Sequence, residues 1–255
     1  MNIIQNFRDT FALANRIMKH NLRSIDTLIT VIAMPVMMLL GMVYIFGGAI
    51  QIPGVSQEDY INYVLPAILL MTIATGSAYT SLRINLDKTS GMFDRFKSMP
   101  ISKSSVLGGQ VIASVVFMLV SIIAVLLVGF LAGFRSEATF SEWLLVGFML
   151  ILFSLTLTWL SVPFGLVAGS IEGAGSFSYI LLMMLFVSSA FVPVDGMPKV
   201  VRLFAENQPM TPIIQTIRNL LNSQAAGNDL WVSIGWMVLI IMISYIFGMK
   251  AYRRV

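Results

Sequence analysis

Residues 104–134 read SSVLGGQVIASVVFMLVSIIAVLLVGFLAGF and contain no aspartate, glutamate, lysine, arginine or histidine. A helix of about 20 predominantly apolar residues crosses the hydrocarbon core of a bilayer, which is about 30 Å thick. The run is long enough to cross that core once and too short to cross it twice. It therefore predicts a membrane-spanning helix, and with it the class of the whole protein.

Uncharged runs of this kind recur along the chain, which has 255 residues, of which 57% are hydrophobic and 11% are charged. In soluble proteins roughly a quarter of the residues are charged. We therefore expect a single all-α integral membrane domain over residues 1–255, with six transmembrane helices. The six uncharged runs cover residues 27–57, 60–82, 104–134, 143–171, 173–194 and 230–249.

The first 24 residues differ from these runs because basic side chains interrupt them. Ile3, Phe7, Phe11 and Met18 recur at helical spacing, and most of the charged residues lie on the other side. This pattern predicts an amphipathic helix over residues 1–24 that lies in the inner membrane interface. The segment lacks the short basic start and the cleavage site of a signal peptide, so we expect the first span to be retained.

The basic residues are distributed unevenly between the two sides of the expected membrane. Twelve of the sixteen lysines and arginines fall in the N-terminal segment, in the loop 83–103 and in the C-terminal tail. Cytoplasmic loops of membrane proteins carry the excess of basic residues. Both termini and the loop 83–103 are therefore expected to be cytoplasmic.

The segment 195–229 between the fifth and sixth runs is too polar to cross a membrane. Val200 and Phe204 belong to one apolar helical face, and Thr211 as N-cap with Pro212 at the first helical position predicts a second helix. We expect an external, re-entrant segment of short amphipathic helices that dip into the outer leaflet. The pattern is compatible both with shielding the bundle and with gating it.

The loop 83–103 is the most densely charged segment between two uncharged runs. Within it, Met92, Phe93, Phe96 and Met99 share one face of a predicted short helix, and charged residues occupy the other faces. Such a helix either lies on the lipid headgroups or docks into a groove on a soluble partner.

Several kinds of chemistry are missing from the sequence. None of the six runs contains an ionisable residue of the kind that proton and ion relays use, which disfavours an ion-coupled carrier. The chain has no GxxxxGK[ST] motif, so ATP would have to be hydrolysed by another polypeptide. It has no cysteine and a single histidine, His20, so we expect no metal site, no catalytic residue and no enzyme activity. A nucleic-acid partner is not expected either.

Two stretches carry a resemblance to a known family. Residues 90–101, SGMFDRFKSMPI, resemble the first cytoplasmic loop of type-2 ABC exporter permeases, close to the daunorubicin-resistance branch. Residues 188–198, SSAFVPVDGMP, followed by NQPMTP at 207–212 and by Ile217-Arg218, are similar to the signature of that family after the fifth span. With the N-terminal helix and six spans, the resemblance covers essentially the whole chain.

The resemblance implies a permease subunit in a bacterial or archaeal cytoplasmic membrane. It would form a homodimer or heterodimer with a second permease copy and bind two ABC ATPase subunits, which hold Mg-ATP, while this chain holds no cofactor. The exported compound would be a hydrophobic or amphipathic small molecule, such as a drug or antibiotic. Alternatives are a lipid-linked polysaccharide, a peptide or sodium as cargo, an ion-coupled carrier or channel, and a membrane anchor that transports nothing.

The resemblance also implies roles for particular residues. In the family, the N-terminal helix and the loop helix fit a groove on each ATPase, with a lesser contact at the turn 170–175. The ATPase contacts would be Met92, Phe93, Asp94, Arg95, Phe96 and Met99, with Arg8 and Arg16 from the N-terminal segment. The substrate path along the dimer interface would include Met34, Met38, Met42, Phe186 and Ser189, and the external gate Phe191, Pro193, Met197 and Pro198.

Overall fold

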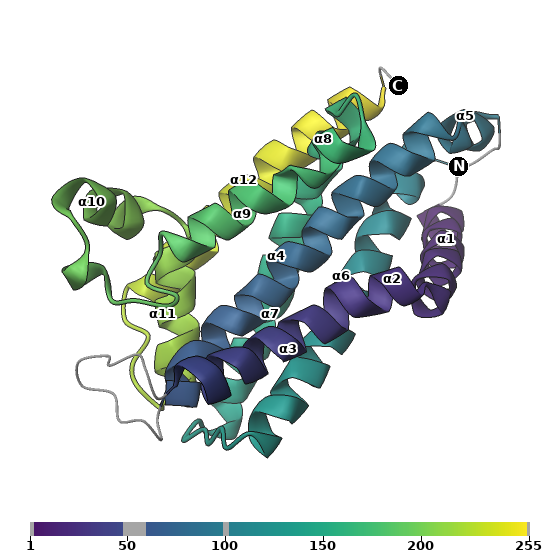
Figure 1. Ribbon diagram of the computed structural model, residues 1–255. Coiled ribbons are helices and arrows are strands. Elements are labelled where there is room, and N and C mark those ends of the chain that lie inside the picture. Colours follow the sequence, from purple (N-terminus) through teal and green to yellow (C-terminus); the bar gives the residue numbers. More distant parts are fainter. Residues whose placement is uncertain (1–2, 48–59, 99–101, 254–255) are drawn as a thin grey trace.

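The computed structural model describes residues 3–47, 60–98 and 102–253, and over these residues the chain is built of helices without strands (Figure 1). Four long helices carry the fold, and shorter helices sit at both ends of the bundle. In chain order the elements are α1 (Ile3–Arg23), α2 (Ile25–Leu28), η1 (Ile29–Ala33), α3 (Met34–Gly41), η2 (Met42–Phe46), α4 (Tyr60–Thr89), α5 (Met92–Lys97), α6 (Lys103–Leu131), α7 (Phe140–Val167), α8 (Ile171–Gly175), α9 (Phe177–Phe186), η3 (Val194–Gly196), α10 (Lys199–Asn207), α11 (Met210–Leu221) and α12 (Asp229–Tyr252).

Five helical stretches among the described residues are long and apolar enough to cross a membrane, which makes the chain a multi-pass membrane protein. They are Ile25–Phe46, which joins α2 to η2, and the helices of Tyr60–Thr89, Ser104–Leu131, Phe140–Val167 and Asp229–Tyr252. The predicted fifth span of six, residues 173–194, is not a long helix. A shorter apolar stretch, Ile171–Phe186, takes its place, so the structure does not confirm the count of six full-length spans.

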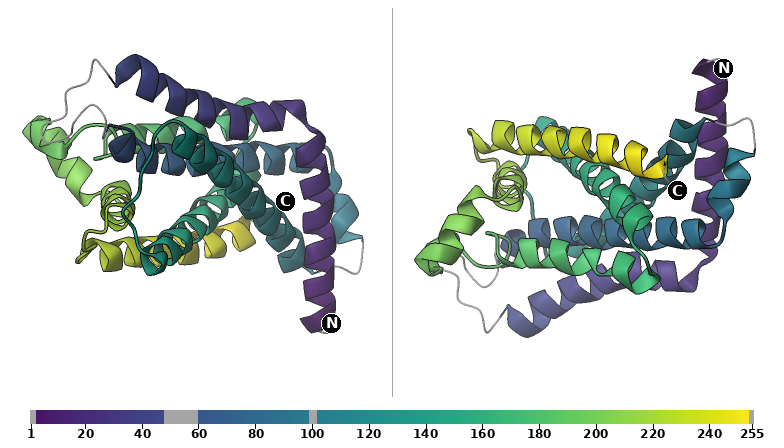
Figure 2. Two further views of the ribbon diagram at one scale, coloured as in Figure 1. Left: turned by 90° about the horizontal axis from the view of Figure 1, so that it is seen from below. Right: turned by 90° about the horizontal axis from the view of Figure 1, so that it is seen from above.

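The helix α1 lies crosswise at one end of the bundle, and α5, α8 and the end of α12 lie at the same end (Figures 1 and 2). It crosses α6 at Gly109, where an added Cβ atom would stand 2.9 Å from Cβ of Leu13 and 3.1 Å from the carbonyl oxygen of Thr10. Only glycine allows helices to pack this closely. A helix over the N-terminal segment is therefore confirmed, and its crosswise position is what an interfacial helix would adopt.

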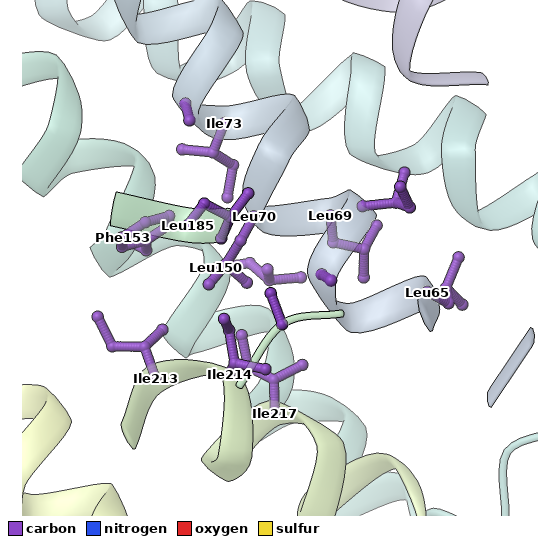
Figure 3. Close-up of a cluster of buried hydrophobic side chains, with 14 of the residues drawn as sticks. Leu65, Leu69, Leu70, Ile73, Leu150, Phe153, Leu185, Ile213, Ile214 and Ile217 are labelled. Atoms are coloured by element: carbon purple, nitrogen blue, oxygen red, sulfur yellow. The ribbon is translucent and has the colours of Figure 1, made fainter. Parts of the chain in front are cut away.

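The helix α4 lies at the centre of the bundle. In its most apolar stretch of 18 residues, 78% is buried, compared with 17% of the corresponding stretch of α12. Its apolar side chains form the main core with those of α7, α9 and α11 (Figure 3). The labelled members of this core are Leu65, Leu69, Leu70, Ile73, Leu150, Phe153, Leu185, Ile213, Ile214 and Ile217.

The two helices predicted within residues 195–229 exist, but they differ in their surroundings. The side chains of Val200 and Phe204 on α10 are exposed, whereas α11 contributes Ile213, Ile214 and Ile217 to the main core. The expectation that both helices dip into the outer leaflet stays a prediction, and α11 in addition packs one face against the main core. The helix α11 begins two residues earlier than predicted, at Met210 instead of Pro212, and the Thr211 hydroxyl donates to the carbonyl of Ala205 at 2.6 Å instead of capping the helix.

Candidate functional site

The short helix α5 begins directly after α4. Gly91 separates them with a φ of +70°, a left-handed conformation that glycine adopts without strain, and this turns the chain back toward the bundle. The helix then runs over six residues, Met92–Lys97. The loop helix predicted from the sequence is thus present, and Met99 lies outside the described residues.

The two aromatic rings of α5 face the chain's own interior. Phe93 is 1% exposed and Phe96 is 8% exposed, and both belong to a second apolar cluster. The ring of Phe93 meets that of Tyr252 on α12 edge-on, with the centroids 5.2 Å apart. The other buried members of the cluster come from α4, α6 and α7: Ile84, Val106, Leu107, Val111, Val115, Val162 and Leu166.

The sequence suggested that the apolar face of α5 inserts into a groove on an ATPase. Within the chain, Phe93 and Phe96 pack against the ends of α4, α6, α7 and α12, and the contact with an ATPase stays a prediction. The exposed residues of α5 include Asp94 and Arg95. A partner at this end would meet charged side chains, while the rings connect α5 to four other helices.

The helices α1 and α5 form one surface. The Nη2 atom of Arg16 on α1 lies 3.9 Å from the sulfur of Met92, within the range of a weak N–H···S hydrogen bond. Arg8 and Arg16 are exposed on α1, as Asp94 and Arg95 are on α5. We call these five residues the α1–α5 surface.

A cavity of about 540 Å³ lies beside this surface, between α1, α4, α5, α6 and α8. Eight of its fourteen lining side chains are apolar, and the polar ones are Arg16, His20, Tyr79, Arg83, Asp87 and Gln110. Arg83 donates from Nη1 to the side-chain oxygen of Asn21, and the same atom lies 3.2 Å from Nδ1 of His20. The Gln110 amide donates to a carboxylate oxygen of Asp87 at 2.6 Å.

The end of α4 is also tied to the connection between α7 and α8. The ammonium group of Lys88 donates to the carbonyls of Leu166 and Ala168 at 2.7 and 3.3 Å, and the Asn85 amide donates to those of Gly165 and Ala168 at 3.1 and 2.8 Å. Helices leave their last carbonyls without internal partners, and a cation is favourable at that end. These bonds fix the end of α7 against α4.

The following turn is short and exposed. In α8, Ile171, Glu172 and Gly173 are exposed, and hydrogen bonds from its own backbone N–H and from the Ser170 hydroxyl lower the pKa of the Glu172 carboxyl. This is the only charged side chain of α8.

At the opposite end of the bundle, Arg218 of α11 holds a second polar site. Its Nη2 atom lies 3.2 Å from the carbonyl oxygen of Tyr63 and 3.1 Å from each of the carbonyls of Ser189 and Ala190. The guanidinium also stacks on the Tyr63 ring. Burial lowers the pKa of Arg218, and the neighbouring Tyr63 opposes that shift. Arg218 belongs to the sequence motif quoted above, but no role was predicted for it. Its position in an otherwise apolar helix could have indicated a buried polar site.

The sequence model of the family described as ABC-2 type transporter matches residues 8–222. The chain belongs to this family. The ABC-2 match covers α1, α5 and the Arg218 site, and thus both ends of the bundle.

Several known permeases are similar to most of the chain. A daunorubicin resistance ABC transporter permease protein of Streptomyces coeruleorubidus is 29% identical over 230 residues, which are 89% of this chain and 80% of that protein. A putative transport permease of Cyanophora paradoxa is 24% identical, over 97% of this chain and 89% of its own length. A probable doxorubicin resistance ABC transporter permease protein of Mycobacterium tuberculosis is 20% identical, over 96% and 88%. The chain is therefore homologous to permeases named for drug resistance.

In this ABC-2 chain none of the residues suggested for the substrate path and the gate lines the cavity beside the α1–α5 surface. Met34 is exposed on α3 and Phe186 at the end of α9, whereas Ser189 is buried and its carbonyl accepts from Arg218. The rings of Phe186 and Phe191 stack with their centroids 4.9 Å apart. Of the remaining suggested residues, Met38, Met42, Pro193 and Met197 are half-buried and Pro198 is exposed.

Within residues 3–47, 60–98 and 102–253, no group of three or more histidine, aspartate and glutamate residues could hold a metal ion.

Proposed function

We propose that this chain is the membrane subunit of an ATP-driven exporter of hydrophobic or amphipathic compounds, with drugs or antibiotics as the cargo class. ATP, as Mg-ATP, is hydrolysed by a separate ABC ATPase, two copies of which bind the cytoplasmic end of a permease dimer. The drug-resistance names of two of the relatives support the cargo class. The missing GxxxxGK[ST] motif supports a separate ATPase.

The observation that carries the proposal is the packing of Phe93 and Phe96. A helix that is exposed on one side and inserted between four spans on the other transmits a push on its exposed side to the bundle. The ATPase contacts the α1–α5 surface, and Phe93, Phe96 and Met92 transmit its movement. The turn at α8, with Glu172, makes a lesser contact.

The substrate path runs along the interface between two permease copies. The stretch Ile25–Phe46 supports this arrangement, because only 17% of its most apolar 18 residues is buried within the chain. Met34, Met38 and Met42 lie on it, and α9 presents Phe186. A second copy, bound lipid or the cargo itself covers these side chains, and the gate forms around Phe191 at the opposite end from α5.

Reconstitution distinguishes the proposal from the alternatives. The chain is placed in proteoliposomes alone and together with an ABC ATPase that co-purifies with it, and ATP-driven accumulation of a fluorescent amphiphile such as daunorubicin is measured. We expect accumulation only with the ATPase and with hydrolysable ATP. Transport by the chain alone under a sodium or proton gradient would instead identify an ion-coupled carrier. A complex that hydrolyses ATP but moves no compound of this class would contradict the cargo assignment.

A further inference from the structure

The cavity beside the α1–α5 surface has a strongly basic side. Arg16 and His20 of α1 and Arg83 of α4 line it, and a second cavity of about 490 Å³ shares Arg16 and His20. Lys19 and Arg23 line that second cavity, together with Ser24. The two cavities therefore share Arg16 and His20, and Lys19 and Arg23 add positive charge beside the first one.

The acidic side chain in the cavity offsets only part of this charge, because the lining has two arginines and one carboxylate. Asp87 is the single carboxylate of the lining, and its Oδ2 atom already accepts from Gln110 at 2.6 Å. Arg16 and Arg83 carry fixed positive charges, since a guanidinium stays protonated in proteins. The field inside the cavity is therefore positive and favours an anion over a cationic compound.

The geometry of Arg83 suits a fixed ligand position. Its Nη1 atom is held by the side chains of Asn21 and His20, which orients the planar guanidinium. Its Nε atom has no partner among the described residues, and neither has Oε1 of Gln110, a side chain that is only 2% exposed. Buried polar groups in proteins are normally paired, so an unpaired donor and an unpaired acceptor at one cavity indicate a missing polar partner.

The rest of the cavity is apolar, and this decides the kind of anion. Leu13 and Ile17 of α1, Leu82 and Leu86 of α4, and Ile171 of α8 are among its eight apolar lining residues. A free inorganic anion would leave them without a contact. A ligand with an anionic head and hydrocarbon tails would use both sides.

We propose that this cavity binds the phosphate headgroup of an anionic phospholipid, with Arg16 and Arg83 on the phosphate and the acyl chains along the apolar side. Basic pockets between membrane helices are known to take such headgroups. A glycerol hydroxyl of the headgroup, or a water beside it, supplies the donor that Gln110 Oε1 lacks. Because Arg16 also contacts Met92, the bound lipid connects α1 to α5. The site shares Arg16 and Met92 with the α1–α5 surface, but lipid binding to it can be measured without cargo and without the ATPase.

The test uses the purified full chain in a neutral detergent. A phosphatidylglycerol labelled on its tail is titrated with protein, and its fluorescence anisotropy reports binding. Arg16→Gln with Arg83→Gln removes two positive charges from the cavity, and Lys199→Gln with Lys250→Gln removes two exposed ones elsewhere. We expect the first pair to weaken binding by about tenfold or more, because charge-assisted hydrogen bonds to phosphate are lost, and the second pair to change it by less than about twofold.

Two further variants distinguish a loss of lipid binding from misfolding of the double variant. Arg16→Gln alone removes an exposed side chain whose contact with Met92 is weak, and it should still weaken binding. Ile171→Trp fills the apolar side without changing charge and should do the same. Phosphatidylcholine bearing the same label should bind at least about tenfold less tightly, since its net charge is zero.

Three results would overturn the proposal. One is equal binding of phosphatidylcholine. Another is displacement of the labelled lipid by millimolar inorganic phosphate, which would indicate a site for a free anion. The third is unchanged lipid binding in both the Arg16→Gln, Arg83→Gln variant and the Ile171→Trp variant.

Discussion

The guanidinium carbon of Arg218 lies 3.8 Å from the centroid of the Tyr63 ring, which places a cation of α11 on an aromatic side chain of α4. The same side chain donates to three backbone carbonyls, two of them in the turn that follows α9. Those carbonyls belong to a non-helical stretch next to the apolar core, where no helix partner satisfies them. Arg218 therefore holds the end of α9 against α4.

Arg218→Gln should lower the stability of the protein, because the shorter amide cannot reach all three carbonyls and cannot stack on Tyr63. We expect a loss of about 2 kcal/mol or more, seen as a lower midpoint of thermal unfolding in detergent. The matched control is Arg202→Gln on α10, an exposed arginine paired with Glu206 at 2.7 Å. Exposed pairs contribute about 0–1 kcal/mol, so this variant should unfold nearly like the wild type. Equal midpoints for the two variants would show that the Arg218 site does not stabilise the fold.

Phe93→Ala should destabilise the protein whether or not an ATPase is present. The ring is fully buried against Tyr252, and deleting a buried phenylalanine typically costs about 3–5 kcal/mol. Phe11→Ala on α1 is the control, since that ring is 60% exposed. The measurement is the unfolding midpoint of the isolated chain. An unchanged midpoint combined with lost ATPase binding would mean that Phe93 faces the partner after all.

Gly165→Ala should push α4 and α7 apart. An added Cβ atom would lie 2.6 Å from the carbonyl oxygen of Ser81 and 2.9 Å from Cβ of Ile84, and neither atom belongs to the flexible end of a side chain. Overpacking of this kind costs about 1–3 kcal/mol. Gly147→Ala in the same helix meets nothing within 4 Å and should not destabilise it. The pair is compared by unfolding midpoint, and a loss of stability at Gly147 equal to that at Gly165 would argue against the close crossing.

The distribution of charge was sufficient to predict most of the spans. A charged side chain at the centre of a bilayer is costly, so its absence over about 20 residues is an informative pattern. The helices α4, α6, α7 and α12 and the stretch Ile25–Phe46 follow the predicted runs closely. The N-terminal helix and the loop helix were also predicted, because their apolar residues recur at helical spacing.

What the sequence left open were contacts between distant segments. Residues 187–193 are as apolar as a span, but the chain ends α9 at Phe186 because Arg218, 29 residues beyond Ser189, offers its carbonyl a partner. The periodicity of α5 predicted an apolar face at Phe93 and Phe96 but not what covers it. Part of that cover is Tyr252, which lies near the C-terminal end of the described residues and packs against Phe93. The same limit applies to α11, whose apolar face was predicted and whose burial was not.

If an ATPase acts on this permease through the α1–α5 surface, a change of charge on α5 should impair transport and a change of charge elsewhere should not. Arg95→Glu reverses an exposed charge on α5, and Lys199→Glu reverses an exposed charge on α10 at the opposite end of the bundle. Neither change touches the apolar core, so both variants should fold like the wild type.

The most direct measurement is ATP-driven accumulation of daunorubicin in proteoliposomes that contain the ATPase and either variant. Loss of one desolvated interface charge pair typically costs about 2–5 kcal/mol, so Arg95→Glu should reduce the accumulation rate by about tenfold or more, while Lys199→Glu leaves it within about twofold. Equal rates for the two variants, with the ATPase bound in both, would contradict the account.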